Sequence, residues 1–313
     1  MPTALQITCL LLLHDHLSPA LEDLQDALKR KAKEFRLAIK SARTHLMEAT
    51  PVRLGAEFHS YVTHLQRATR NVQRVQKELC ILPLGGTAVG TGLNAHPAFA
   101  RLVIARLKKE TELPLREATD HIAAQSFPSA ILSLSSTLRE VALALGKIAQ
   151  DIRMMAAIGE ITLPKIHSGS SIMPGKVNPT IPEAMLQVTA RVVGGDATVA
   201  HLCATLSNFE LFTGLPLLAA EILSAIELLG SASCVFTEHC VKGMSACSDV
   251  ITRQLACSPM LVTALAPELG YDAAAEIAEE AQRKGLTILE VASRRTTLPK
   301  AKLRRLLDPR RMV

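Results

Sequence analysis

At 313 residues, the chain is long enough to bury a sizeable core and to hold two domains. Its apolar mass comes mostly from alanine and leucine, with no Trp and only 3% aromatic residues, which predicts an all-α fold and argues against sheets. The net charge of +6 is concentrated in residues 283–313, where ten Lys or Arg face only Glu290 and Asp308. That tail has no aromatic residue, and its leucines are spaced as in helices. We therefore interpret its basic residues as the solvated face of a small helical unit and not as a nucleic-acid-binding arm.

The cysteine and histidine patterns exclude two common kinds of site. Seven cysteines form an odd set without a CxxC pair, which predicts reduced, mostly buried thiols in a cytosolic or organellar-matrix protein. Ten histidines show neither HxxxH nor HExxH spacing, so no metal site is expected.

The first helical pattern covers residues 4–40 and predicts one or two helices. Its start, Ala4–Leu13, is apolar like a signal-peptide core but lacks a basic flank and a cleavage site, so we expect a buried helix. No other stretch reaches the ~18 uncharged apolar residues of a membrane span, and no membrane partner is expected. A polar break at Ser41–Pro51 then precedes a long helix that ends near Leu79.

The middle of the chain combines a glycine-rich loop with a regular helix. The loop, Leu84–Pro97, fits neither GxGxxG nor GxxxxGK and follows no strand pattern, so we reject a nucleotide site. The helix is predicted over Ile131–Ile152, where apolar residues recur at steps of three and four and form a seam that must bury against other helices. Because few charges lie on its other faces, we expect further subunits to supply some of the partners.

The last third of the chain predicts two long helices and a set of short ones. The long helices are Ile181–Leu206 and Leu215–Phe236, and a weaker boundary falls near Ser245–Cys257. We therefore expect a helical bundle domain with the active-site loops at residues 1–254 and a small C-terminal helical domain at 255–313. The short segments are 260–266, 272–284, 287–294 and 299–307.

The segment Gly169–Pro179, GSSIMPGKVNP, is the most informative for chemistry. Its small residues and two prolines predict a loop that lifts a serine hydroxyl off any regular element. A serine is a poor base unless nearby cations or N–H dipoles stabilise its alkoxide, and Lys176 is the obvious charge for that task. A flexible Ser/Gly linker is the alternative for an arbitrary loop of this composition.

Three loop segments together resemble class II fumarase, of the fumarase/aspartase lyase superfamily. They are SARTHLMEATP at 41–51, GGTAVGTGLN within 84–97 and GSSIMPGKVNP at 169–179, in the family's order. Similarity continues through MLVTALAPELGYDAAAEIA at 260–278 and GLTILEVA at 285–292, so it covers nearly the whole chain.

The resemblance implies a long antiparallel helical bundle that assembles as a homotetramer, with several chains contributing to each active site. It also implies a carbon–oxygen lyase of the tricarboxylic acid cycle, which adds water to fumarate in the anti sense to give L-malate and needs no cofactor. The substrate is a small dicarboxylate, and the compartment is the cytoplasm or the mitochondrial matrix.

The resemblance also assigns residue roles. Ser170 matches the base that removes the carbon-bound proton, with Ser171 beside it as a substrate-binding residue. Lys176 and Asn178 match groups that hold the adjacent carboxylate and stabilise its aci form. On the leaving-group side, His45 and Thr44 match family residues, and Glu183 is the carboxylate partner of the histidine.

Several of these residues have ordinary structural alternatives. His45 could be a surface or capping histidine, and Arg43 either a second anion anchor or a solvated charge. Glu183 follows Thr180 at the T-x-x-E spacing of a capping box. Glu160, which precedes the signature loop, is expected to shape its hinge. Aspartases carry glutamine at position 45, so His45 favours fumarase, and aspartate ammonia-lyase is the alternative.

Three departures from the family pattern bear on activity. The opening MPTALQIT resembles the middle of the family's S-N-D-x-x-P-T-A segment, so the N-terminal domain with its substrate contacts is expected to be missing. A complementing subunit, or a catalytically silent truncated subunit, are then the alternatives to an autonomous enzyme. Met154–Pro164 lacks a Gly-Pro-Arg insert, and Gly214 would cost roughly 1 kcal/mol if it lay inside a helix.

Overall fold

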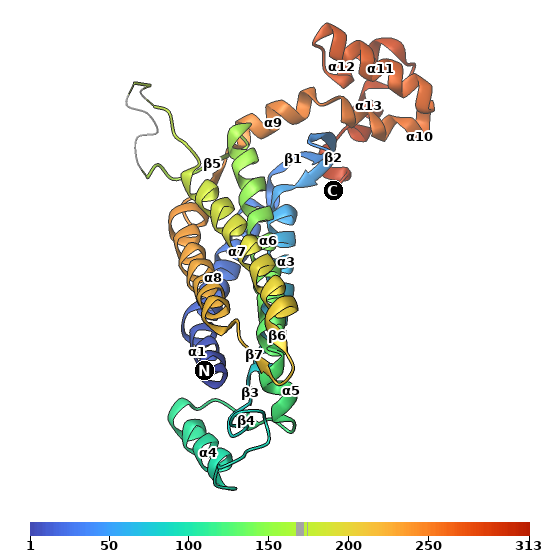
Figure 1. The fold of residues 1–313 in the computed structure, drawn as a ribbon. Helices are drawn as coiled ribbons and strands as arrows, with labels where there is room; N and C mark the ends of the chain where they lie inside the picture. Colours follow the sequence, from blue (N-terminus) through green and yellow to red (C-terminus); the bar gives the residue numbers. More distant parts are fainter. Residues whose placement is uncertain (167–171, 174) are drawn as a thin grey trace. The chain divides into compact units, whose positions relative to one another are not determined.

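The computed structural model describes residues 1–166, 172–173 and 175–313 (Figure 1). The chain is predominantly helical, as the composition predicts, and forms two compact units. Unit 1 comprises residues 1–26, 63–153 and the described part of 168–240. Unit 2 comprises residues 27–62, the described part of 154–167 and 241–313.

Long helices carry most of the chain up to residue 241. The first pattern, expected to be helical over 4–40, is helical only as far as Leu37, because Ile39 and Lys40 already belong to a strand, whereas the helix expected to end near Leu79 does end there. The helices are α1 (Pro2–Leu12), a π-helical turn (Leu13–Leu17), α2 (Ser18–Glu34), a 3₁₀ turn (Phe35–Leu37), α3 (Leu54–Leu79), α4 (Phe99–Thr111), α5 (His121–Ser126), α6 (Ser129–Ala157), α7 (Thr180–Leu206), α8 (Leu215–Phe236) and a second π-helical turn (Thr237–Val241).

The predicted seam of α6 is the core of unit 1. Every seam residue is buried, with exposed fractions of 4% or less. The Ser135 hydroxyl of α6 donates to Asp196 of α7, whereas Gly146 of α6 lies against Thr189. Contacts that advance along α6 while they retreat along α7 show that the two helices are antiparallel. The seam residues are Ile131, Leu134, Leu138, Val141, Leu145, Ile148 and Ile152.

Helix α8 packs on α7 and α1 and continues into the second π-helical turn. Together, Leu215–Val241 span 27 residues with a mean hydropathy of 1.6 in their most apolar window, so by length and composition alone this stretch could cross a membrane. A core helix can meet the same test, but only 33% of that window is buried here, with Leu218 and Leu229 among the fully buried residues of α8. Gly214 is the N-cap of α8 and lies outside the helix, so the expected cost of an internal glycine does not arise.

The polar break at Ser41–Pro51 is a β-hairpin, a strand pair that helical periodicity did not predict. β1 (Ile39–Thr44) and β2 (Met47–Arg53) pair antiparallel, with a register shift between Ser41 and Arg43. The remaining strands are short two-residue pairs: β3 (Ile81–Leu82) with β4 (Arg116–Glu117), β5 (Ile161–Thr162) with β8 (Ser245–Ala246), and β6 (Ser207–Asn208) with β7 (Leu211–Phe212).

The C-terminal part of unit 2 has its own apolar core. Leu265, Val291 and Leu303 are fully buried within it. Helix α9 occupies the segment expected to be a weak boundary, and the predicted border at residue 254 remains a prediction. The elements are α9 (Ser248–Cys257), a 3₁₀ segment (Pro259–Leu265), α10 (Ala266–Leu269), α11 (Tyr271–Lys284), α12 (Ile288–Arg295), α13 (Lys300–Leu306) and a 3₁₀ turn (Pro309–Arg311).

Candidate active site

The hairpin turn of unit 2 carries the histidine that the sequence singled out. Thr44 pairs with Met47 at the end of the ladder, so His45 and Leu46 form the two-residue loop. Their φ angles are 52° and 65°, as a type I′ turn requires at both central positions. Glycine or asparagine normally fills such positions, because a Cβ is strained in the left-handed region. Two side-chain-bearing residues at this turn are therefore an unusual arrangement, of the kind found at functional sites.

The side chains at this turn project from their own unit. Thr44 and His45 are both exposed, and Leu46 and Met47 are 67% and 71% exposed. Among the described residues, His45 makes no hydrogen bond or ion pair, which argues against the capping alternative. Its imidazole is thus available for a ligand or for a neighbouring chain.

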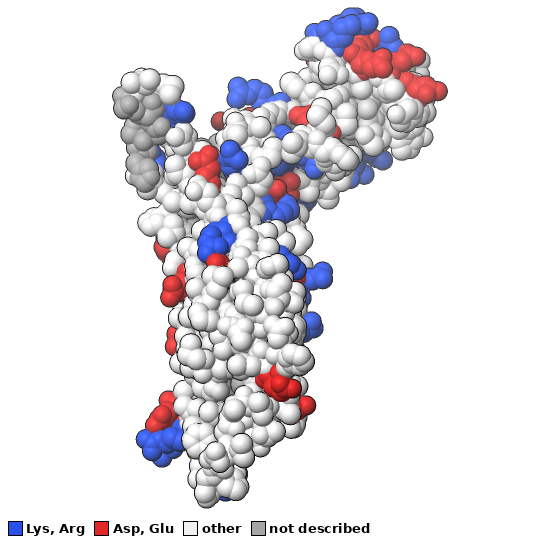
Figure 2. Space-filling view, in the orientation of Figure 1, with Lys and Arg blue, Asp and Glu red and all other residues white. Residues whose placement is uncertain are grey.

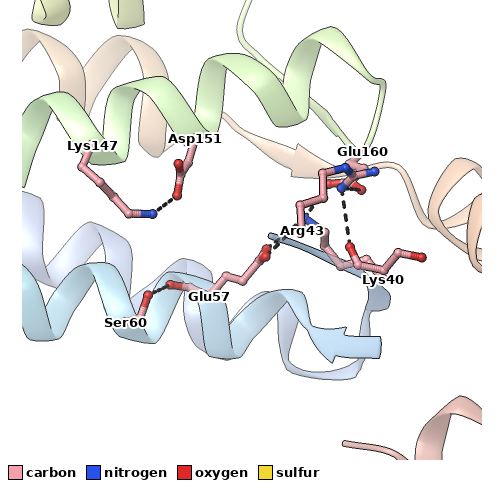
Figure 3. A network of polar contacts seen from close by, with 8 residues as sticks. Lys40, Arg43, Glu57, Ser60, Lys147, Asp151 and Glu160 are labelled. Carbon is pink, nitrogen blue, oxygen red and sulfur yellow. Dashed lines mark hydrogen bonds and ion pairs between the residues drawn. The ribbon is translucent and has the colours of Figure 1, made fainter. Parts of the chain in front are cut away.

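Behind the turn lies a buried group of charges (Figure 3). The carboxylate of Glu160, only 1% exposed, lies 2.6 Å from the Lys40 ammonium through Oε2. Its Oε1 accepts a hydrogen bond from Arg43 Nη1 at 2.5 Å. Lys40 also donates to Glu57 of α3 at 3.0 Å, so two cations face two carboxylates. Buried charges need such pairing, because an isolated ion in a protein interior is strongly unfavourable.

Sequence reasoning missed this group almost entirely. Glu160 was expected only to shape a loop hinge, and Lys40 and Glu57 were not singled out. A signal was present, since an acidic residue followed by a short apolar run ahead of a loop is a candidate for burial. Its partner Arg43 lies 117 residues away along the chain, and only the fold reveals the pairing.

The signature loop is described in part. Ser170 and Ser171, the predicted base and its neighbour, lie outside the described residues. Lys176 is exposed and closes a turn, in which its N–H donates to the Met173 carbonyl while Gly175 has a φ of 84°. Gly175 suits such a turn, because glycine tolerates the positive φ. Asn178 follows, half-buried, immediately before α7.

Glu183 lies in the first turn of α7, but the predicted capping box is wrong. The N-cap of this helix is Pro179, so Thr180 is already inside the helix, and among the described residues no side chain caps it. Glu183 instead forms a half-exposed ion pair with Arg153 of α6, at 3.5 Å. The capping box, which was the structural alternative to a functional Glu183, is thereby removed.

The predicted site residues thus fall into two groups. Arg43, Thr44 and His45 lie together on the hairpin of unit 2. Lys176, Asn178 and Glu183 lie together around the start of α7 in unit 1.

The glycine-rich loop has a packing function. A Cβ at Gly90 would lie 2.6 Å from the backbone of Ile122 in α5, so only glycine fits there. Gln125 of the same helix donates to the Ala88 carbonyl. These contacts account for the glycine at position 90.

The cysteines offer no reactive nucleophile in the core. All seven are unpaired, and Cys9, Cys80, Cys203 and Cys240 are buried, as expected for reduced thiols. Burial raises the pKa of the Cys9 and Cys240 thiols to about 12, so both stay protonated at neutral pH.

Comparison with known proteins decides the family. Residues 1–194 match the Lyase family, and residues 261–313 match the Fumarase C C-terminus family. The chain belongs to the lyase family of the class II fumarate hydratases. The class II fumarate hydratase of Methylorubrum extorquens is 41% identical over 317 aligned residues, which cover all of this chain and 67% of the relative.

Eukaryotic and solved relatives agree with this membership. The mitochondrial fumarate hydratase of Rattus norvegicus is 42% identical over 93% of this chain and 58% of its own length. The crystal structure of a class II fumarase from Schistosoma mansoni superposes with a TM-score of 0.94 at 31% identity, covering 99% of this chain and 69% of that one. The fold expected from the three motifs is therefore confirmed, and the chain spans about two thirds of the length of the bacterial relative.

Proposed function

We propose that this chain is a carbon–oxygen lyase that interconverts fumarate and L-malate by anti addition of water, without a cofactor. The supporting observation is similarity to class II fumarate hydratases along the entire chain, with Ser170, Lys176, Asn178 and His45 all present in their motifs. The exposed position of His45 at a strained turn is consistent with a role in chemistry.

Proton transfer is assigned to the signature loop. In the dehydration direction, the Ser170 oxygen takes a proton from the malate carbon next to a carboxylate, and the electron pair moves into that carboxylate. Lys176 and Asn178 stabilise the resulting aci-carboxylate by charge and hydrogen bonding, which lowers the barrier because these donors are already oriented. Ser171 completes the anion contacts on the same loop, and Arg43 is assigned as a further anion anchor.

The leaving-group side is assigned to the hairpin. As the electron pair returns to carbon, the C–O bond breaks and hydroxide leaves as water after protonation. His45, oriented by the Glu183 carboxylate, donates that proton, and Thr44 hydrogen-bonds the leaving oxygen. As the resemblance implies, the proposal includes several subunits at each site.

A homotetramer is the assembly we propose, and the surface of unit 1 supports self-association. Helix α7 exposes small residues in a row, at Ala190, Gly194, Ala197 and Ala204. Such a row lets another helix approach closely. Figure 2 shows a mostly uncharged surface over the long helices on the side in view. Light scattering tests this part, and a monodisperse monomer at micromolar concentration would contradict it.

The compartment that we propose is the cytoplasm or the mitochondrial matrix. Seven unpaired cysteines fit a reducing compartment, in which a tricarboxylic acid cycle reaction takes place.

The decisive experiment is fumarate release by the purified chain, with L-malate and L-aspartate offered in parallel. We expect release from malate only, and a loss of about 100-fold or more in Ser170→Ala, since a general base contributes at least that much. Ser168→Ala, two residues away in the same segment, is the matched control and keeps its rate. Release from aspartate would favour an ammonia-lyase, and no release from a folded protein would favour a silent subunit.

A further inference from the structure

We infer that Glu160 is a positioning residue, whose buried carboxylate fixes the hairpin turn that presents Thr44 and His45. The inference rests on the proposed function for its catalytic meaning, but its structural part stands on the contacts of unit 2 alone. Glu160 is only 1% exposed, and it acts through Lys40 and Arg43 of β1.

Glu160 is itself held firmly by its backbone. Its N–H donates to the Met155 carbonyl at the end of α6, and its carbonyl accepts from the Cys247 N–H at 2.8 Å. The next residue, Ile161, is paired with Ala246 in the β5–β8 ladder. Backbone contacts on both sides therefore make the carboxylate a fixed point within unit 2.

Both oxygens of this fixed carboxylate bind side chains of the same strand, β1. Oε2 lies 2.6 Å from Lys40, near the start of β1, and Oε1 accepts from Arg43 near its end. Strand alternation would place side chains 40 and 43 on opposite faces of a regular β1. The register shift lies between them, and such a bulge increases local twist, which accounts for both reaching one group.

Arg43, the second of these partners, is close to the turn. It pairs with Glu48, and the next pair, Thr44 with Met47, is the last before His45 and Leu46. Both loop residues have positive φ, a conformation that persists only where the surroundings impose it. The tip itself is exposed, so the restraint comes from the strand residues directly behind it, among them Arg43.

Stability alone does not explain such a network. Buried ion pairs can often be replaced by apolar residues without loss of stability, so their presence is better explained by what they position. Arg43 is only 21% exposed and Lys40 only 4%, so solvent screens the group weakly.

The test compares Glu160→Gln with Asp196→Asn. Asp196 of α7 is a matched control, because its carboxylate is 6% exposed and is bound by Arg139 and by the Ser135 hydroxyl, but it belongs to unit 1. We expect Glu160→Gln to raise amide hydrogen exchange over residues 43–47 by about tenfold or more and to broaden the His45 imidazole NMR signals, while Asp196→Asn changes neither.

Steady-state kinetics test whether the position of the turn matters for catalysis. We expect Glu160→Gln to lower kcat about 100-fold, because His45 is misplaced for the reaction itself, and to raise KM for malate by a smaller factor, because Arg43 loses a charged partner. Unchanged exchange over residues 43–47, an equal rise in Asp196→Asn, or a normal kcat would overturn the inference.

A second variant covers a failure of Glu160→Gln to fold. Arg43→Gln leaves Glu160 paired with Lys40, and the same local rise in exchange is expected there. If the unmodified chain releases no fumarate, the proposed function fails, while the exchange comparison still decides whether Glu160 fixes the turn.

Discussion

The hairpin Ile39–Arg53 and the C-terminal helices α11–α13 belong to the same unit but are stabilised in opposite ways. The hairpin is held by ion pairs that join Lys40 and Arg43 of β1 to the buried Glu160 carboxylate. The C-terminal helices share a buried apolar cluster, and the ion pair Arg295–Glu276 among them is at the surface. Apolar burial stabilises without fixing direction, whereas paired charges and hydrogen bonds fix the position of particular groups. The difference fits a hairpin that positions candidate catalytic side chains and a C-terminal region that contributes mainly to stability.

The largest expected effect is on the buried ions. Glu160→Gln leaves Lys40 and Arg43 facing a neutral amide, and breaking a buried pair costs about 3–5 kcal/mol of unfolding free energy. Glu276→Gln, which removes a surface carboxylate bound by Arg295, should have a much smaller effect. Urea unfolding of the two variants measures this. Equal losses would mean that the two regions do not differ in the way described.

A cavity in the C-terminal cluster should come next. Leu303 is fully buried there, so Leu303→Ala should cost about 2–5 kcal/mol through lost transfer energy and an unfilled cavity. Hydrogen exchange should rise over α11–α13 and remain unchanged over residues 39–53. If the hairpin amides also lose protection, the apolar cluster supports both regions and the comparison fails.

The strained turn gives a smaller effect of unusual sign. Leu46 has a φ of 65° and is 67% exposed, so Leu46→Gly relieves strain and loses little packing. After the entropy cost of glycine, we expect a gain of up to about 1 kcal/mol. Leu37 is the matched control, since it is 73% exposed and does not have a positive φ.

The Leu37→Gly control should be destabilised by about 0.5–1 kcal/mol. Thermal unfolding of the two variants gives the signs. A loss of stability in Leu46→Gly comparable with that in Leu37→Gly would show that the turn is not strained.

Sequence predicted the helices well and the hairpin poorly, for a physical reason. The seam of α6 is visible because burial of one helical face imposes a regular apolar spacing. The turn at His45–Leu46 lacks the Asn-Gly signature of its conformation, because distant contacts rather than local preference impose it. Glu160 and Arg43 are likewise brought together only by the fold.

Capping shows the same limit at two sites with one spacing. Thr180–Glu183 and Thr287–Glu290 both read T-x-x-E, yet only the second forms a capping box. Helix α7 begins one residue too early, with Pro179 as its N-cap, whereas Thr287 is the N-cap of α12. A one-residue difference in where a helix starts lies below the resolution of periodicity.

That capping box also gives the smallest predicted effect, a pH dependence confined to the C-terminal region. Hydrogen bonds from the Thr287 N–H and hydroxyl hold the pKa of Glu290 below its usual value. A carboxylate whose pKa is lower in the folded state stabilises it above its unfolded pKa, and this contribution is lost as pH falls through the folded value. Glu290→Gln should therefore lower Tm slightly at pH 7, and the difference from the unmodified chain should vanish in acid. Circular dichroism melts across the acidic range measure this, and a difference that stays constant with pH would mean that the Glu290 charge contributes nothing to holding α12.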